Sequence, residues 1–212
     1  MTGIFISLEG PDGSGKSTAA KKIVPQLQQL STQEVVLTRE PGGSAIAEQL
    51  RDIILDVHNS AMDARTEALL YAAQRRQHIV DVILPALQAN KIVLSDRYID
   101  SSVAYQGAGR QLGMQEICQL NLFATQKLLP QLTLYFDIPP AVGLKRIQQK
   151  RAQAADRLEK EQLDFHQRVT AAYQQLIKQD ADRIVKIDAL QTPDQVVADC
   201  LAIISQRFNL GD

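Results

Sequence analysis

The sequence predicts an α/β fold built on one parallel sheet of five strands, with helices on both faces. Five short runs rich in Val, Ile, Leu and Phe lack strict apolar–polar alternation, which is typical of strands that are covered on both faces. The strands are expected at residues 4–8, 35–38, 92–95, 132–136 and 184–187. Helical patterns separate these runs, and that order favours a doubly wound sheet with right-handed crossovers. A glycine-rich loop after the first run is the third observation.

The helices expected between the strands follow from apolar residues that recur every three or four positions. They cover residues 16–30, 44–56, 64–89, 114–128, 141–151, 158–179 and 193–208. Thr192 and Pro193 start the last one with an N-cap residue and a proline at the first helical position. A chain of 212 residues suffices for one α/β domain, so we expect a single domain over residues 1–212.

The loop after the first strand carries the phosphate-binding pattern Gly-x-x-x-x-Gly-Lys-Ser, between a strand and a helix as that motif requires. Its glycines let the backbone surround a phosphate with N–H groups. Lys16 is expected to reach the outer phosphates, and the Ser17 hydroxyl to bind Mg²⁺. A glycine-rich turn with no ligand is the alternative. The pattern predicts a nucleoside triphosphate site at Gly10, Pro11, Asp12, Gly13, Ser14, Gly15, Lys16, Ser17 and Thr18.

Charged residues follow three further strands, at the sheet edge where ligands bind in such folds. The segment 38–43 carries both charges, residues 96–102 begin with an acid and an arginine, and Asp137 follows the fourth strand. A carboxylate at a strand end commonly holds Mg²⁺ beside phosphates. We favour Asp96 for this role and interpret Asp137 as a helix-capping or turn carboxylate.

Arginines near this edge suggest a second phosphate site. Arg97 could grip a phosphate with two parallel hydrogen bonds, or could form a structural ion pair with Asp96. Arg51 could reach the same phosphate from its helix, or could lie on a solvated face. The basic segment from Arg146 to Arg157 has the composition of a mobile lid, expected at about residues 147–158, or of an exposed linker.

Composition limits the other possibilities. Apolar residues make up 45% of the chain and charged residues 22%, with a net charge of −1, so we expect no nucleic-acid or membrane partner. No apolar run approaches a membrane span and no signal peptide is visible, which favours a cytoplasmic protein. Cys118 and Cys200 are expected to be buried free thiols. His58, His78 and His166 are isolated, so each should be a surface or core residue.

The motifs resemble those of bacterial thymidylate kinases over essentially the whole chain. The similar segments are residues 5–18 (FISLEGPDGSGKST), 38–43 (TREPGG), 65–78 (RTEALLYAAQRRQH), 96–107 (DRYIDSSVAYQG) and 156–159 (DRLE). The second and fourth of these in combination are far more selective than the phosphate loop alone. The resemblance implies a P-loop nucleoside monophosphate kinase-like fold with a short lid. It also implies Mg²⁺-dependent transfer of the γ-phosphate of ATP to dTMP for dTTP biosynthesis, and a homodimer.

The resemblance implies a role for each matching residue. Asp12 would organise the metal and the acceptor together with Asp96, and Arg146 would lie against adenine. The dTMP site would comprise Glu40, Arg51, Tyr71, Arg75, Arg97, Ser102, Tyr105 and Gln106. In that site Arg51 and Arg97 would hold the phosphate, and Glu40 would belong to the polar centre. The other members would recognise the nucleoside: Tyr71 by stacking on thymine, Arg75 at a carbonyl, Ser102 and Gln106 at the base, and Tyr105 against the 2′ position.

Gly13 distinguishes two types within the family. Eukaryotic-type members carry a catalytic arginine at this position, whereas the bacterial type is expected to use lid arginines, here Arg151 and Arg157. Two alternative functions are possible for a chain with this loop. A related kinase for another nucleoside monophosphate or a small alcohol would need a different pocket. A P-loop GTPase would need Asn-Lys-x-Asp, and residues 90–93 lack the final acid.

Overall fold

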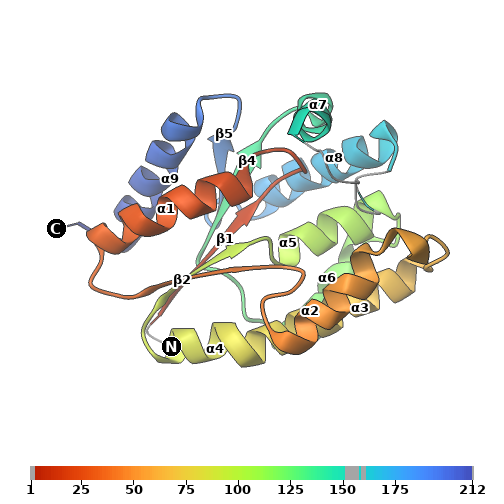
Figure 1. Ribbon diagram of the computed structural model, residues 1–212, viewed down its shortest axis with the longest axis horizontal. Helices are drawn as coiled ribbons and strands as arrows, with labels where there is room; N and C mark the ends of the chain where they lie inside the picture. The colour runs from red at the N-terminus through yellow and green to blue at the C-terminus, as the bar shows by residue number, and fades with distance from the viewer. Residues whose placement is uncertain (1–2, 151–157, 159–160, 212) are drawn as a thin grey trace.

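The computed structural model describes residues 3–150, 158 and 161–211, and contains the expected parallel sheet (Figure 1). Its strands are β1 (Ile4–Glu9), β2 (Val35–Arg39), β3 (Ile92–Asp96), β4 (Leu132–Asp137) and β5 (Ile184–Asp188). They pair in the order β2-β3-β1-β4-β5, and every pair is parallel. The predicted fold class is confirmed. The phosphate loop follows β1, the central strand, which has β3 on one side and β4 on the other.

Helices cover both faces of the sheet, with α1 and α9 on one face and α4 and α8 on the other (Figure 1). The α-helices are α1 (Lys16–Leu30), α2 (Ala45–Leu55), α3 (Ala64–His78), α4 (Leu84–Gln88), α5 (Ile99–Ser102), α6 (Met114–Thr125), α7 (Pro140–Lys150), α8 (Leu163–Gln179) and α9 (Pro193–Phe208). A 3₁₀ turn spans Val57–Asn59, and π-helices span Ile79–Ile83 and Val103–Gly109. Thr192 caps α9 in a capping box, as its sequence predicted.

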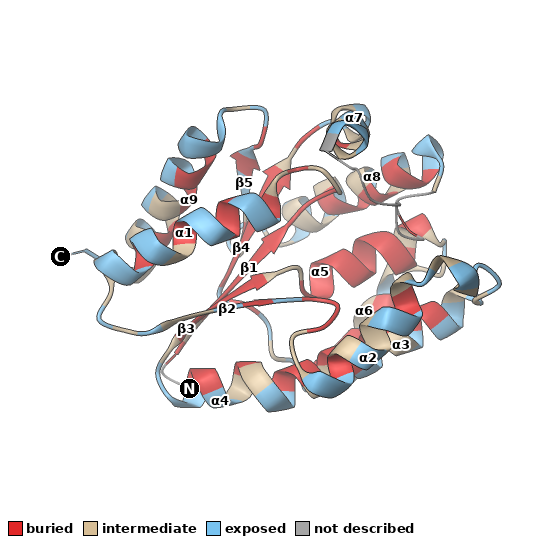
Figure 2. Cartoon of the chain, in the orientation of Figure 1, coloured by how far each residue is buried: buried red, intermediate tan, exposed pale blue. Residues whose placement is uncertain are grey.

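The side chains of the strands alternate between hydrophobic clusters on the two faces of the sheet. Ile6 and Leu8 of β1 pack with residues of α1 and α9, whereas Phe5 packs on the opposite face with Ile79 and Val93. Figure 2 shows the central strands buried along their length, while the helices carry one buried and one exposed side. The apolar runs lacked alternation because both faces of the sheet are covered.

The predicted helix over residues 64–89 is divided by a π-helical segment between α3 and α4. Pro85 lies in the first turn of α4 and has no backbone N–H, so it cannot continue the α-helical hydrogen-bond pattern. The Leu84 N–H instead bonds to the carbonyl of Ile79, five residues earlier. The helix therefore widens by one residue before it continues.

Residues 99–109 form a helix that the sequence did not predict. The segment contains Gly107 and Gly109, which are poor helix formers, and it is not among the helices expected from the sequence. Its first turn is capped by the carboxylate of Glu9, which accepts hydrogen bonds from the N–H groups of Tyr98 (2.7 Å) and Ser101 (3.3 Å). A side chain from β1 thus satisfies the start of a helix that local sequence alone does not favour.

Most of the expected lid lies outside the described residues. Helix α8 begins at Leu163 rather than at residue 158, and α7 ends at Lys150. Arg151 and Arg157 lie outside the described residues, so their predicted roles stay predictions. Leu158 is described and is buried.

The cysteine prediction is half right. Cys200 is fully buried against α1 and the sheet, and this burial raises the pKa of its thiol to about 12. Cys118 is only partly buried, because it follows Ile117, which occupies the inward position of α6. Both cysteines are free thiols.

The histidines divide as expected between surface and core. His58 is exposed, and His166 is buried. His78 is buried but not isolated, since it lies between the Thr38 hydroxyl (2.6 Å) and the Glu40 carboxylate (3.0 Å).

Candidate active site

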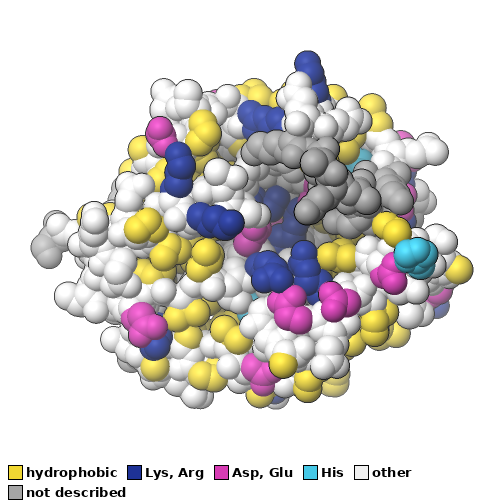
Figure 3. Space-filling model, viewed as in Figure 1, with side chains coloured by type: hydrophobic (Ala, Val, Ile, Leu, Met, Phe, Trp, Pro, Cys, Tyr) yellow, Lys and Arg dark blue, Asp and Glu magenta, His cyan; other side chains and the backbone are white. Residues whose placement is uncertain are grey.

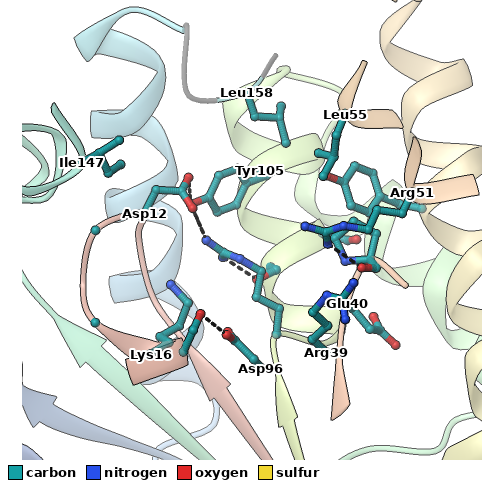
Figure 4. Close-up of a pocket in the computed structure, with 18 of the residues that line it drawn as sticks. Asp12, Lys16, Arg39, Glu40, Arg51, Leu55, Asp96, Tyr105, Ile147 and Leu158 are labelled. Carbon is teal, nitrogen blue, oxygen red and sulfur yellow. Dashed lines mark hydrogen bonds and ion pairs between the residues drawn. The ribbon is translucent and has the colours of Figure 1, made fainter. Parts of the chain in front are cut away.

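A cavity of about 430 Å³ opens at the carboxyl ends of the strands. Figure 3 shows Lys and Arg side chains gathered around this hollow. In Figure 4, Lys16 and Ile147 lie at one end, Leu55 and Arg51 at the other, and Asp12 and Tyr105 between them. The cavity is lined by Asp12, Gly13, Gly15, Lys16, Ser17, Thr18, Arg39, Glu40, Pro41, Arg51, Leu55, Tyr71, Arg75, Asp96, Arg97, Ser101, Ser102, Tyr105, Gln106, Arg146, Ile147 and Leu158. Residues from both predicted nucleotide sites therefore meet in one space.

Lys16 is buried at the base of the phosphate loop. Its ammonium donates hydrogen bonds to the carbonyls of Gly10 and Pro11 (both 2.9 Å) and to the Ser14 hydroxyl (3.2 Å). Gly10, Pro11 and Ser14 therefore support the lysine and do not line the cavity. Burial, with the nearby charge of Arg97, lowers the pKa of Lys16 to about 8. An anionic ligand beside this ammonium would favour its charged form.

Gly13 lies where the loop meets α7. Its φ is 76°, and a Cβ at this position would lie 2.2 Å from the carbonyl oxygen of Gly143. A side chain could fit only if α7 moved away from the loop. The contact gives a structural reason for glycine at this position.

Arg97 pairs with Asp12 of the phosphate loop, so the expected alternative of an ion pair with Asp96 is wrong. Its Nη2 lies 2.5 Å from Asp12 Oδ1, and its Nη1 donates to Gly10 O (3.1 Å) and Ser101 Oγ (2.9 Å). Arg97 has a φ of 73°, which turns its side chain from β3 toward β1. This backbone conformation is unfavourable for arginine and is held by the surrounding contacts.

Tyr105 completes a triad with Asp12 and Arg97. Its hydroxyl donates to Asp12 Oδ2 (2.8 Å) and accepts from Arg97 Nη2 (3.2 Å). The Arg97 guanidinium also lies 4.9 Å from the centre of the tyrosine ring. Burial alone would raise the pKa of Asp12, but the charges of Arg97 and Lys16 and the Tyr105 hydrogen bond hold it below its ordinary value. Asp12 is thus ionised and fixed in place.

Asp96 faces the first turn of α1, where its carboxylate accepts a short hydrogen bond from the Ser17 hydroxyl. Both residues line the cavity. Asp137 does not line it; Asp137 forms an ion pair with Lys186 (2.6 Å) and accepts from Gln174 (3.1 Å). The interpretation of Asp137 as a non-catalytic residue fits this position, although its role is an ion pair rather than a helix cap.

Arg75 occupies the floor of the far end of the cavity and is almost completely buried. Its Nε bonds to Glu40 (2.6 Å), its Nη1 to Ser102 (3.0 Å) and to Asn121, and its Nη2 to the Tyr98 carbonyl (3.1 Å). These contacts hold the guanidinium in a single orientation.

Glu40 is the buried counter-charge of Arg75. Burial would raise the pKa of Glu40, but the Arg75 charge and the His78 hydrogen bond keep it below its ordinary value. This end of the cavity therefore carries a fixed donor set.

The remaining predicted acceptor residues also line this end. Tyr71 lies on α3 one turn before Arg75, which puts both on one face of the helix. Arg51 reaches the cavity from α2 and donates to the Pro41 carbonyl (2.6 Å), so the alternative of a solvated face is wrong. Gln106 lines the cavity from the π-helix Val103–Gly109.

Several lining residues were missed by the sequence interpretation. Arg39 ends β2 directly before Glu40 and forms an ion pair with Glu48 (2.8 Å). Its place at a strand end was a usable signal. Leu55 and Leu158 gave no signal, because an apolar residue on a helix or in a linker has many possible positions.

At the other end of the cavity, Arg146 and Ile147 of α7 lie near the end of β5. Arg146 Nη1 donates to the carbonyl of Ala189 (3.0 Å), just after β5. This contact holds the arginine at the end of the cavity that contains the phosphate loop, and its expected place against adenine stays a prediction.

Glu9 is a further buried group behind the loop. Its Oε2 accepts from the hydroxyls of Ser101 (2.5 Å) and Tyr173 (2.9 Å), in addition to the backbone contacts that cap α5. Ser101 also accepts from Arg97, so Glu9 is linked to the triad through one hydroxyl. Burial, followed by the charge of Asp100, raises the pKa of Glu9 to about 7.

This raised pKa makes a testable contribution to stability. Between the unfolded value of 4.5 and about 7, the folded chain binds a proton that the unfolded chain releases. The stabilisation is thus present below pH 4.5 and is lost as pH rises through 7. We expect the free energy of unfolding to fall more between pH 5 and pH 8 in the wild type than in Glu9→Gln. Urea unfolding of both proteins across this range measures the difference, and equal pH dependences would contradict the assignment.

Comparison with known proteins identifies the family. The family model described as thymidylate kinase matches residues 8–200. Thymidylate kinase from Latilactobacillus sakei is 56% identical over 206 residues, covering 97% of this chain and 96% of that protein. The Pediococcus pentosaceus enzyme is 54% identical, covering 99% and 100%. A crystal structure of thymidylate kinase from Ehrlichia chaffeensis has a TM-score of 0.79 at 28% identity, covering 96% of this chain and all of that one. The chain belongs to the thymidylate kinase family.

Proposed function

We propose that this protein transfers the γ-phosphate of ATP to dTMP, giving dTDP and ADP in the biosynthesis of dTTP. The observation that carries the proposal is the single cavity that joins the phosphate loop to an aromatic and polar pocket. Family membership supports the same reaction. Phosphoryl transfer depends on positioning and charge neutralisation, and both ends of the cavity are built from fixed, paired side chains.

In this proposal the loop residues from Gly10 to Thr18 bind the phosphates of ATP, and Lys16 stabilises the charge on the transferring group. Arg146 lies against adenine. Arg97 and Arg51 hold the dTMP phosphate from opposite sides of the cavity. Because Arg97 contacts both Asp12 and the acceptor end, it can align the two phosphates for in-line transfer.

Mg²⁺ is the expected cofactor, and the oxygen donors beside the loop fit it. The Ser17 hydroxyl and the Asp96 carboxylate are adjacent and border the cavity, and Mg²⁺ prefers such oxygen ligands. Asp12, the third proposed ligand, has both carboxylate oxygens engaged by Arg97 and Tyr105. We therefore propose Ser17 and Asp96 as the principal metal ligands, directly or through water. When bound, the ion would neutralise charge on the phosphates.

The lid is proposed to supply further positive charge. Arg151 and Arg157 follow α7, whose residues Arg146 and Ile147 already border the cavity. With Gly13 packed against α7, the loop itself has no arginine to stabilise the transferring phosphoryl group. The two lid arginines are the proposed catalytic replacements.

Thymine recognition is the property that best tests the proposed function. Tyr71 offers a stacking platform, Arg75 a donor for a carbonyl, and Gln106 an amide for N3, while Tyr105 borders the sugar. We expect turnover of dTMP first, weaker turnover of dUMP because it lacks the methyl group, and very poor turnover of dCMP, UMP, AMP and GMP. Sites of this kind can discriminate by up to about 10⁴-fold.

A coupled ADP-release assay with ATP and this panel measures the preference directly. Tyr105→Ala should relax the preference for deoxyribose. Tyr105→Phe is the matched control, since it keeps the ring and removes only the hydroxyl contacts with Asp12 and Arg97. Efficient phosphorylation of AMP or CMP by the unmodified protein would indicate a related kinase for another monophosphate instead.

We also propose that the protein acts as a homodimer in the cytoplasm. Exposed apolar side chains occur on the neighbouring helices α2, α3 and α6, namely Ile46, Ile53, Leu69 and Phe123. Phe123 is 86% exposed, and Ile46 and Ile53 are two turns apart on α2. A second copy covering this surface would remove the patch from water.

In the described part of the chain, none of the helices has the length and apolar character of a membrane span.

Sedimentation equilibrium tests the dimer. The wild type should sediment as a dimer at micromolar concentrations, and Phe123→Asp should shift it toward monomer by placing a charge in the interface. A wild type that remains monomeric at tens of micromolar would refute the proposed assembly.

A further inference from the structure

We infer that Glu67 is a positioning residue that sets the orientation of the Gln106 amide, and through it the preference for thymine over cytosine. The inference rests on the proposed function, because it concerns the base end of the same cavity. Neither residue is near the phosphate loop in the sequence, and Glu67 does not line the cavity. Its effect on the ligand would therefore be indirect.

The contact between the two side chains is direct and buried. Gln106 Nε2 donates to Glu67 Oε1 at 2.9 Å. Glu67 is fully buried in the first turn of α3, and Gln106 is 1% exposed. Gln106 nevertheless borders the cavity from the π-helix. The nitrogen end of the Gln106 amide thus contacts the Glu67 carboxylate, while the residue also borders the cavity.

The carboxylate determines which end of the amide faces it. An ionised carboxylate can only accept hydrogen bonds, so the amide nitrogen is favoured beside Glu67 and the carbonyl oxygen is disfavoured there. Among the described residues, no donor is paired with Oε1, the side-chain carbonyl oxygen of Gln106. That oxygen is therefore available to a ligand as an acceptor in a known orientation.

An acceptor at this position distinguishes pyrimidine bases. Thymine and uracil carry an N3–H donor, whereas N3 of cytosine is an acceptor. A fixed carbonyl opposite N3 would pair with thymine and would meet cytosine with two acceptors facing each other. Leaving buried polar groups unpaired is what makes such sites selective.

Glu67 is itself held by Arg110, which directly follows the π-helix Val103–Gly109. Arg110 Nε lies 3.3 and 3.2 Å from the two Glu67 oxygens, and its Nη2 lies 3.1 Å from Oε2. Arg110 also bonds to Glu161 (2.5 Å), and its guanidinium lies 5.1 Å from the centre of the Phe165 ring. The arginine is the counter-charge of the Glu67 carboxylate, and these contacts hold the carboxylate oxygens in place beside Gln106.

A double-mutant cycle tests the inference. The proteins are the wild type, Glu67→Gln, Gln106→Ala and the double variant, and the readouts are kcat and KM for dTMP, dCMP and ATP. Glutamine at residue 67 has nearly the same shape but can accept or donate, so the Gln106 amide is free to turn over. We expect the ratio of kcat/KM for dTMP over dCMP to fall by about tenfold or more, mainly through the KM for dTMP. The KM for ATP should stay unchanged.

The same substitution should have little effect once Gln106 is removed. In the Gln106→Ala background, Glu67→Gln should change the ratio by less than about twofold, because the two residues act as a unit. Glu161→Gln is the matched control. It removes the outer partner of Arg110 and should leave the base preference unchanged. Glu67→Asp keeps the negative charge beside Arg110 but moves the acceptor oxygen away from Gln106, because its side chain is shorter. This variant replaces Glu67→Gln in the cycle if Glu67→Gln does not fold.

Three results would overturn the inference. They are an unchanged dTMP to dCMP ratio in Glu67→Gln and Glu67→Asp, an equal drop of the ratio with and without Gln106, and an equal drop in Glu161→Gln. An equal loss of turnover with both bases would mean that Glu67 has only a structural role. Failure of the wild type to use dTMP would instead refute the proposed function itself, so the two outcomes are distinguishable.

Discussion

Lys16→Ala is expected to lower kcat by at least about 10²-fold while leaving the protein folded, because one strong electrostatic stabiliser of the moving phosphoryl group is lost. In the free protein the ammonium also bonds to the carbonyls of Gly10 and Pro11, so the loop loses an internal support as well. The fold should persist, since the apolar core of α1 is made by other residues, Ile23 and Leu27 among them.

Steady-state kinetics with ATP and dTMP, together with circular dichroism, measure this prediction. Lys22→Ala is the matched control on the same helix. Lys22 forms an exposed ion pair with Asp194, and such pairs contribute little, so its removal should leave kcat unchanged. Near-native turnover in Lys16→Ala would remove the basis for assigning the phosphate loop.

Arg97→Ala should mainly impair the dTMP side, with a higher KM for dTMP and a lower kcat. Removing one partner of a fully buried charge pair typically costs about 2–5 kcal/mol, and the partly exposed pair of Arg97 with Asp12 should lie toward the lower end of that range. Asp12 would lose its nearest cation, and its carboxylate would be less well fixed. Because Arg97 also bonds to Gly10 of the loop, a smaller rise in the KM for ATP is expected.

Arg97→Lys separates charge from geometry. Lysine keeps the positive charge but cannot reproduce contacts with Asp12, Gly10 and Ser101 from one planar group, so we expect only partial rescue of kcat. Measured KM values for both substrates decide the assignment. An effect confined to the KM for ATP would move Arg97 to the donor site.

The parts of the fold that the sequence predicted correctly are those encoded within a few residues. Apolar runs identified the strands, and Gly15, Lys16 and Ser17 identified the phosphate loop, because strand and loop signals depend on neighbouring positions. The helix over residues 99–109 was missed for the opposite reason. Its cap is Glu9, which lies 89 positions from Tyr98 in the chain, and its own residues favour a loop.

The sequence by itself determined the fold class, the phosphate loop and the set of residues at the strand ends. Tertiary structure decided which of them pair. Arg97 adjoins Asp96 in the chain but bonds to Asp12, 85 positions away, because β1 and β3 are neighbours in the sheet and the backbone of Arg97 turns its side chain toward β1. Likewise Glu67 accepts a hydrogen bond from Gln106 only because α3 packs beside the π-helix Val103–Gly109. Local sequence sets which chemical groups are present, whereas strand order and helix packing set the distances between them.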